Sequence, residues 1–148
     1  MATPGVRQET SLRIERTFAA PPERVYAAWT KAEALARWMA PTDDYTVVVT
    51  DLELNVGGRW RLEMRHKGGA VHTVAGTYRT VTLNSRLAYT WAWEENPAAG
   101  ETLVTVQFLA EGTGTRVVVT HERFPDAETR DKHNEGWIGC LARFERLF

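Results

Sequence analysis

Histidines are the side chains of this chain that could transfer protons or bind a metal ion near neutral pH. The 148 residues contain four of them, namely His66, His72, His121 and His133. A tight turn at Gly68-Gly69 would pair Arg65 with His72. His66 and His72 would then lie on opposite faces of the hairpin, so we predict no shared metal site through these two side chains.

Two of the histidines are better placed to meet a ligand. His121 shares its strand parity with Val117 and Val119, and His133 lies on the same helical stripe as Trp137. Both could reach the mouth of a cavity and bind a polar group there. The alternative for each is a histidine that is hydrogen-bonded at the edge of the core.

The carboxylates and the single cysteine give no reaction mechanism. Glu63 and Glu122 fall on the outer parity of their predicted strands, and Glu94 and Glu95 form the solvated end of another strand. Cys140, inside a predicted helix, is expected to be a small structural thiol. Because no inward acid is paired with a base, we predict no catalytic residue, no metal site and no cofactor, and we favour a protein that is not an enzyme.

Large apolar side chains are spaced so that they can line a hollow between a sheet and a helix. The set comprises Trp60, Met64, Tyr89, Trp91, Trp93 and Trp137. We predict that these residues form the apolar wall of a ligand site, in which His66, His121 and His133 orient polar groups. The alternative is a solid core, of which tryptophan is an ordinary component. Trp29 and Trp38 are expected to anchor two short helices instead.

Composition excludes several classes of protein. The 18 Lys and Arg residues are balanced by 19 Asp and Glu residues, so we expect no nucleic-acid partner. One cysteine cannot form an internal disulfide, which favours a reducing cytoplasm. No apolar run is long enough for a membrane span, and the polar residues 1–10 are expected to form a disordered leader before a single domain at 11–148. A monomer or a homodimer is expected.

The elements that must position these residues follow from their hydrophobic periods. Alternation with period two predicts seven strands, at Ser11 to Ala19, Tyr45 to Leu54, Arg59 to His66, Val71 to Thr82, Arg86 to Glu94, Thr102 to Ala110 and Thr115 to Glu122. Short helices are predicted after Pro21 and over Lys31 to Trp38. A long helix is predicted after Asp126, a candidate N-cap.

Short turn-like segments separate the later strands and indicate antiparallel neighbours. A sheet of this kind must cover its apolar face, and the last helix is the element long enough to do so. The prediction is therefore an α+β fold in which a curved seven-stranded antiparallel sheet wraps around the C-terminal helix. The first half of that helix is polar, so any opening should lie nearer its N-terminal half.

Short motifs spread along the chain resemble those of one protein family. They are Arg16-Thr17-Phe18, Ala20-Pro21-Pro22-Glu23-Arg24-Val25-Tyr26, Ala28-Trp29-Thr30, Trp38, Gly57-Gly58-Arg59-Trp60, Gly76-Thr77-Tyr78, Leu87-Ala88-Tyr89-Thr90-Trp91, Gly114-Thr115-Arg116-Val117, His121 and Gly136-Trp137. In order and spacing the chain resembles bacterial single-domain proteins similar to the C-terminal domain of the Hsp90 ATPase activator. The resemblance implies the helix-grip fold of the START and Bet v 1-like superfamily, with a cavity between sheet and helix. It carries no catalytic residue to this chain.

Three functions follow as expectations. The first is binding of a small hydrophobic or amphipathic molecule between the sheet and the long helix. The second is an enzyme of the polyketide cyclase or aromatase type that uses the same cavity, with His121 as the candidate titratable group. The third is an Hsp90-type co-chaperone or protein-interaction module, whose functional surface would lie outside the cavity.

Overall fold

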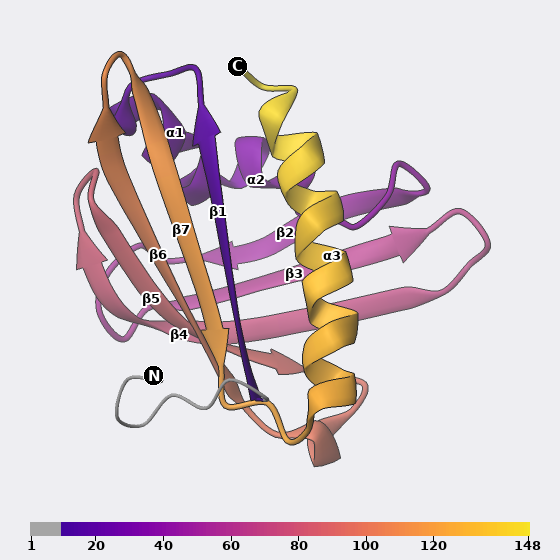
Figure 1. Cartoon of the computed structure of the whole chain (residues 1–148). Helices are drawn as coiled ribbons and strands as arrows, with labels where there is room; N and C mark the ends of the chain where they lie inside the picture. Colours follow the sequence, from indigo (N-terminus) through magenta and orange to yellow (C-terminus); the bar gives the residue numbers. More distant parts are fainter. Residues whose placement is uncertain (1–9) are drawn as a thin grey trace.

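A computed structural model describes residues 10–148 of the chain (Figure 1). The leader predicted over residues 1–10 lies outside the described residues, except for Thr10. The elements are β1 (Ser11–Phe18), α1 (Pro22–Thr30), α2 (Ala32–Trp38), β2 (Tyr45–Leu52), β3 (Arg59–His66), β4 (Val71–Thr82), β5 (Arg86–Trp93), the short 3-10 helix η2 (Pro97–Ala99), β6 (Thr102–Glu111), β7 (Gly114–Glu122) and α3 (Ala127–Glu145). Within this part of the chain, no helix combines the length and the apolarity needed to cross a membrane.

The seven strands form one antiparallel sheet in the order β1-β7-β6-β5-β4-β3-β2. Register shifts interrupt β2 between Val49 and Asp51 and β4 between Tyr78 and Thr80. Such irregularities bend a strand and increase its twist, which lets the sheet curve. Figure 1 shows β1, β6 and β7 running across the direction of β2 and β3, with α3 in front of the sheet. The predicted helix-grip fold is confirmed.

The long helix α3 begins where the sequence predicts. The side chain of Asp126 accepts a hydrogen bond of 2.8 Å from the backbone N–H of Thr129, which satisfies one free amide of the first turn. The buried residues of α3 are Trp137, Cys140, Leu141 and Phe144, all in its C-terminal half. The N-terminal half therefore has no buried side chain that seals it against the sheet.

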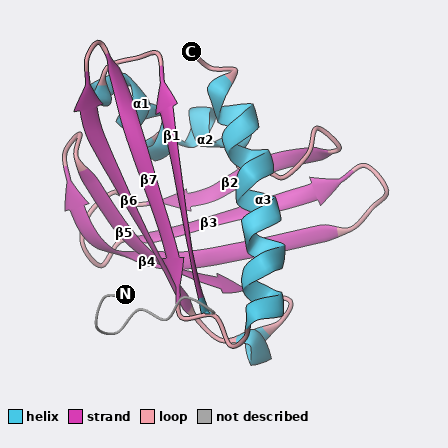
Figure 2. Ribbon diagram, viewed as in Figure 1, coloured by secondary structure: helices cyan, strands magenta, loops and turns pink. Residues whose placement is uncertain are grey.

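The two short helices close one end of the space between α3 and the sheet (Figure 2). Trp38 is fully buried, donates its indole N–H to the carbonyl oxygen of Ala28 at 2.9 Å, and meets Phe144 of α3 at a ring distance of 4.6 Å. Trp29 lies 4.5 Å from Trp38 and 5.2 Å from Phe144, between ring centroids. This aromatic cluster anchors α1 and α2, as predicted, and fills that end.

The hairpin between β3 and β4 differs from the sequence-based prediction. His72 pairs with Met64, and Arg65 pairs with Val71. The His66 N–H donates to the carbonyl oxygen of Ala70, so these two residues lie opposite each other and residues 67–69 form a turn of three residues instead of two. The register shifts by one residue, and such a shift moves every side chain to the other face. His66 and His72 therefore share the face that looks toward α3, and their predicted separation was wrong.

Candidate functional site

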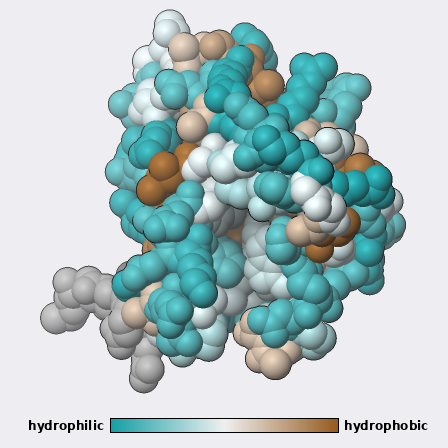
Figure 3. All heavy atoms as spheres, turned by 90° about the vertical axis from the view of Figure 1, so that its right-hand side faces the viewer, coloured by the Kyte–Doolittle hydropathy of each residue, from teal (hydrophilic) through white to brown (hydrophobic). Residues whose placement is uncertain are grey.

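A pocket of about 650 Å³ lies between the middle of α3 and the strands β3, β4 and β5. It opens on the side of the molecule that faces the viewer in Figure 3, where the surface is hollowed within a largely hydrophilic rim. The lining residues are Met39, Pro41, Tyr45, Met64, His72, Trp91, Trp93, Glu95, Asn96, Lys132, His133, Gly136, Trp137 and Cys140. Lys132 and His133 come from the N-terminal half of α3, and Trp137 and Cys140 come from its C-terminal half.

Three tryptophans form the aromatic wall of the pocket. Trp91 and Trp93 are two residues apart on β5, so both face α3. Their ring centroids are 5.5 Å apart, and Trp137 of α3 lies 5.8 Å from Trp91. The indole nitrogen of Trp91 is buried and has no hydrogen-bond partner among the described residues. The wall offers flat, rigid apolar surfaces to a ligand.

Sulfur-containing side chains lie at the inner end of the pocket. Met39 follows α2, Met64 comes from β3, and Cys140 comes from α3. Burial raises the pKa of the Cys140 thiol to about 12, so the thiol stays protonated near neutral pH. A buried, protonated thiol is a poor nucleophile, and methionine adapts its shape to what it contacts. This end of the pocket is therefore apolar and deformable.

His121 is held in a chain of hydrogen bonds behind the wall. The indole N–H of Trp137 donates to its Nδ1 at 3.0 Å, so Nε2 carries the proton. Nε2 lies 2.7 Å from the hydroxyl of Thr102, which donates to the carbonyl oxygen of Trp91 at 3.2 Å. Burial, followed by the nearby His133, lowers the pKa of His121 well below its usual value. His121 is fully buried and does not line the pocket.

His133 lines the pocket, but both its ring nitrogens are engaged. Nδ1 lies 2.9 Å from the carbonyl oxygen of Thr129 and donates to it, whereas Nε2 accepts the indole N–H of Trp93 at 2.9 Å. Burial lowers the pKa of His133, and the hydrogen bond to Thr129 opposes this shift only in part. The neutral imidazole thus fixes the Trp93 indole in position and links β5 to α3.

A polar rim borders the mouth of the pocket. Nδ1 of His72 donates to Oε2 of Glu95 at 2.9 Å, and the Thr73 N–H donates to Oε1 at 2.9 Å. Partial burial raises the pKa of Glu95, but the hydrogen bonds from Thr73 and His72 outweigh it, and the net pKa is lowered. Asn96 and Lys132 complete the rim. Glu95 is therefore part of the site and not merely a solvated strand end.

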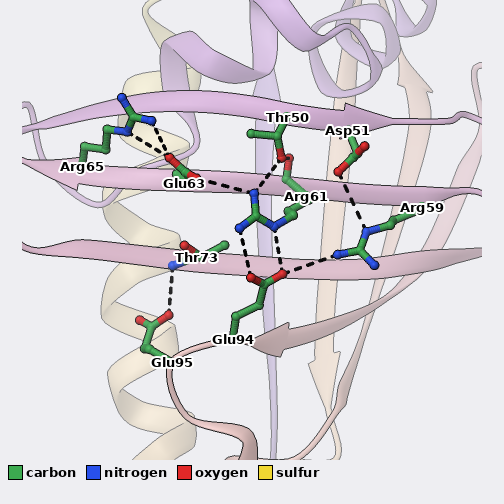
Figure 4. Close-up of polar contacts among 9 residues, drawn as sticks. All are labelled: Thr50, Asp51, Arg59, Arg61, Glu63, Arg65, Thr73, Glu94 and Glu95. Atoms are coloured by element: carbon green, nitrogen blue, oxygen red, sulfur yellow. Dashed lines mark hydrogen bonds and ion pairs between the residues drawn. The ribbon is translucent and has the colours of Figure 1, made fainter.

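Glu94, the neighbour of Glu95, points to the outer face of the sheet (Figure 4). The guanidinium of Arg61 donates to both its carboxylate oxygens, at 2.9 and 3.0 Å, and Arg59 approaches within 3.5 Å. The hydrogen bond from Arg61 lowers the pKa of Glu94, against a smaller effect of burial. Arg61 also contacts Glu63. Glu94 therefore belongs to a charged network on the outer face, and it does not line the pocket.

The predicted site residues divide into two groups. Those that line the pocket are Met64, Trp91, Trp93, His133 and Trp137, whereas Trp60, His66, Tyr89 and His121 do not. Trp60 and Tyr89 border a space of only about 10 Å³ near α1, too small for an organic ligand. His66 accepts the Gly68 N–H within the β3–β4 turn and packs 5.0 Å from the ring of Tyr45.

Several pocket residues were not anticipated from the sequence. His72 was assigned to the wrong face by the assumed turn length. Met39 and Pro41 come from the segment between α2 and β2, where periodicity gives no direction, and Tyr45 is the first residue of β2. Within residues 10–148, no three His, Cys, Asp or Glu side chains are grouped so that they could hold a metal ion. What remains is an open, mainly apolar pocket with a polar mouth.

Comparisons with known proteins agree with this architecture. The family model described as "Activator of Hsp90 ATPase homolog 1-like protein" matches residues 19–148. A protein from Chromobacterium violaceum of known structure is 27% identical, with a TM-score of 0.86 over 93% of this chain and 96% of that one. The AHSA1 protein from Silicibacter pomeroyi is 26% identical, with a TM-score of 0.81 over 92% and 95%.

An AHSA1-like protein from Aeromonas hydrophila is 28% identical and has a TM-score of 0.75, over 92% of this chain and 90% of that chain. No match was found among curated protein sequences. The family model covers nearly the whole described chain, and these three structures share its fold over more than nine-tenths of its length. The chain therefore belongs to the family of Activator of Hsp90 ATPase homolog 1-like proteins.

Proposed function

We propose that this protein binds a small hydrophobic or amphipathic molecule in the pocket between α3 and the sheet. The observation that carries the proposal is the volume of about 650 Å³, which falls within the usual range for organic ligands. Trp91, Trp93 and Trp137 would contact the apolar body of the ligand. The rim formed by His72, Glu95, Asn96 and Lys132 would contact its polar part, or the surrounding water.

The hydrogen bonds around the pocket support a preformed site. The indole of Trp93 is fixed by His133, and the indole of Trp137 is fixed by His121. Side chains that are already ordered lose little entropy when a ligand arrives, so less of the contact energy is spent on ordering them. A hollow in a core would otherwise lose contacts and destabilise the fold, and a bound molecule would restore those contacts.

Titration with a panel of lipids, aromatic compounds and polyketide-like molecules tests the proposal. A ligand that binds beside three tryptophans should change their fluorescence. At a concentration of about 100 Kd it should also stabilise the folded state by about 2.7 kcal/mol, which raises Tm. If no compound of the panel changes either the fluorescence or Tm, the proposal loses its support.

An enzyme that acts through His121 has less support. A general base must come within hydrogen-bond reach of the proton that it removes. His121 is fully buried, and both of its nitrogens are engaged inside the core. A chaperone-directed role, suggested by the family's description, stays a prediction, and so does the cytoplasmic location suggested by the single cysteine.

A further inference from the structure

One histidine of the pocket has a ring nitrogen that is free to meet a ligand. His133 uses both nitrogens within the protein, whereas His72 uses Nδ1 alone. No residue of the described chain bonds to Nε2 of His72. Its side chain is 45% exposed and lines the mouth of the pocket, so the nitrogen is accessible from solvent and from a bound molecule.

The neighbours of His72 decide what its free nitrogen can do. Glu95 is held by the Thr73 N–H and accepts from Nδ1 of His72, so the proton of a neutral imidazole resides on Nδ1. Nε2 then presents a lone pair and acts as a hydrogen-bond acceptor. The complementary ligand group is therefore a donor, such as a hydroxyl.

The charged residues of the rim indicate whether the ligand group that donates to His72 is ionised or neutral. Lys132 and Glu95 carry opposite charges on the two sides of the mouth, from α3 and from the end of β5. Because these two charges cancel, the mouth offers no net electrostatic gain to an ionised group, which would also lose bound water. An uncharged donor avoids this cost. The wall of Trp91 and Trp93 in turn favours a flat ring over a flexible chain, because offset and edge-to-face ring contacts add to the apolar burial.

We propose that the pocket selects aromatic compounds that carry an uncharged hydroxyl group, and that this hydroxyl donates a hydrogen bond to Nε2 of His72. Glu95 acts through His72 as a positioning residue, because it fixes the tautomer and the orientation of the ring. This inference rests on the proposed function, since it names the class of ligand that the same pocket takes. The inference also gives a role to His72 and Glu95, which the sequence analysis predicted on the outer face and at a solvated strand end.

A matched pair of probes isolates the hydroxyl. We would measure binding of 2-naphthol and of 2-methoxynaphthalene by calorimetry at about pH 8, above the ordinary pKa of histidine. The methoxy compound keeps the two rings and the oxygen but cannot donate a hydrogen bond. One hydrogen bond to a partly exposed acceptor is expected to favour 2-naphthol roughly three- to tenfold in Kd. Equal affinities, or a preference for the methoxy compound, would overturn the inference.

Variants distinguish His72 from other sources of the preference. His72→Phe keeps a ring at the rim and should bring the two affinities to within roughly twofold while 2-methoxynaphthalene still binds. Glu95→Gln should reduce the preference, whereas Glu94→Gln, the same change on the outer face, should leave it intact. A preference that survives in His72→Phe refutes the role of His72.

The same experiment separates this inference from the proposed function. If both probes bind equally and the wall tryptophans report them, the pocket is a ligand site without hydroxyl selection. If neither probe binds up to its solubility limit, the aromatic hydroxyl class is refuted, and the wider panel decides the proposed function independently. Circular dichroism and thermal unfolding of each variant confirm that it is folded.

Discussion

Substitutions of a helix residue that lines the pocket should weaken ligand binding without unfolding the protein. Gly136 lies inside α3 and lines the pocket, and a Cβ added there meets no atom within 4 Å. Glycine in a helix interior is less favourable than alanine by about 0.5–1 kcal/mol. Glycine at position 136 therefore makes the helix less stable than alanine would, and it leaves space in the pocket. Gly136→Ala and Gly136→Leu restore the helix preference and occupy the space to different extents.

The magnitude follows from the carbon atoms that the new side chain displaces. The four side-chain carbons of leucine would take the place of ligand carbons, each worth about 0.8 kcal/mol. Loss of four such contacts costs about 3 kcal/mol, or roughly a hundredfold in Kd. Gly136→Ala removes only one, so its Kd should rise about fourfold. Both variants should be at least as stable as the original protein, by about 0.5–1 kcal/mol for alanine.

Gly139, one helical turn further, supplies the matched control. A Cβ at this position would overlap the carbonyl oxygen of Pro41, so the same Gly→Ala change must displace the backbone. We expect Gly139→Ala to lower the free energy of unfolding by about 1–3 kcal/mol. Urea unfolding measures stability, and tryptophan fluorescence titration measures Kd. If Gly136→Leu unfolds like Gly139→Ala, or if it binds ligands as tightly as Gly136→Ala, the pocket is not where we place it.

Polar side chains in the core and at the start of α3 give three further predictions. Trp137→Phe leaves Nδ1 of His121 without a donor, so the free energy of unfolding, measured by urea denaturation, should fall by about 1–3 kcal/mol. A loss below about 0.5 kcal/mol would contradict the hydrogen bond between Trp137 and His121. The pKa values of His121 and His133 are lowered in the folded state, so the unfolded chain binds more protons below about pH 6.5. The free energy of unfolding should therefore fall as the pH decreases from about 6.5, by up to about 1.4 kcal/mol per pH unit for each histidine. A flat stability profile between about pH 7 and pH 5 would refute both neutral histidines. Asp126→Ala removes the cap on Thr129 and should cost about 1 kcal/mol by thermal or urea unfolding, with no change in ligand affinity.

Much of the fold was predictable because its signals are local. Alternating side chains and short turns indicate antiparallel strands, and Asp126 marks the start of α3 through its side-chain oxygen. Parity also assigned Met64, Trp91 and Trp93 to the inner face correctly. Parity fixes the face of a residue but not its distance from α3. Trp60 and Tyr89 share the inner face and nevertheless belong to the core under α1.

The residues at the polar mouth of the pocket could not be predicted from the hydrophobic periodicity of the sequence. A turn of three residues, where two were assumed, brought His72 to the inner face beside Glu95. Tyr45, the first residue of β2, lines the pocket because the segment before it packs beside the C-terminal half of α3, where Ala40 and Asp43 contact Arg143 and Arg146. His121 was predicted on the correct face, but its burial depends on the ring of Trp137, which comes from a distant segment. Loop length and long-range packing thus determined what sequence periodicity left open.

The indole N–H signals of the tryptophans in a two-dimensional proton–nitrogen NMR titration test the central claim most directly. Each signal reports one residue, and assignment by single Trp→Phe variants makes the readout specific. If a ligand occupies the pocket, the signals of Trp91, Trp93 and Trp137 should shift together with one Kd. The signal of Trp38, which is buried at the end of α2 and does not line the pocket, should stay in place. Shifts confined to Trp38, or a bound ligand that moves none of the three wall indoles, would contradict the account.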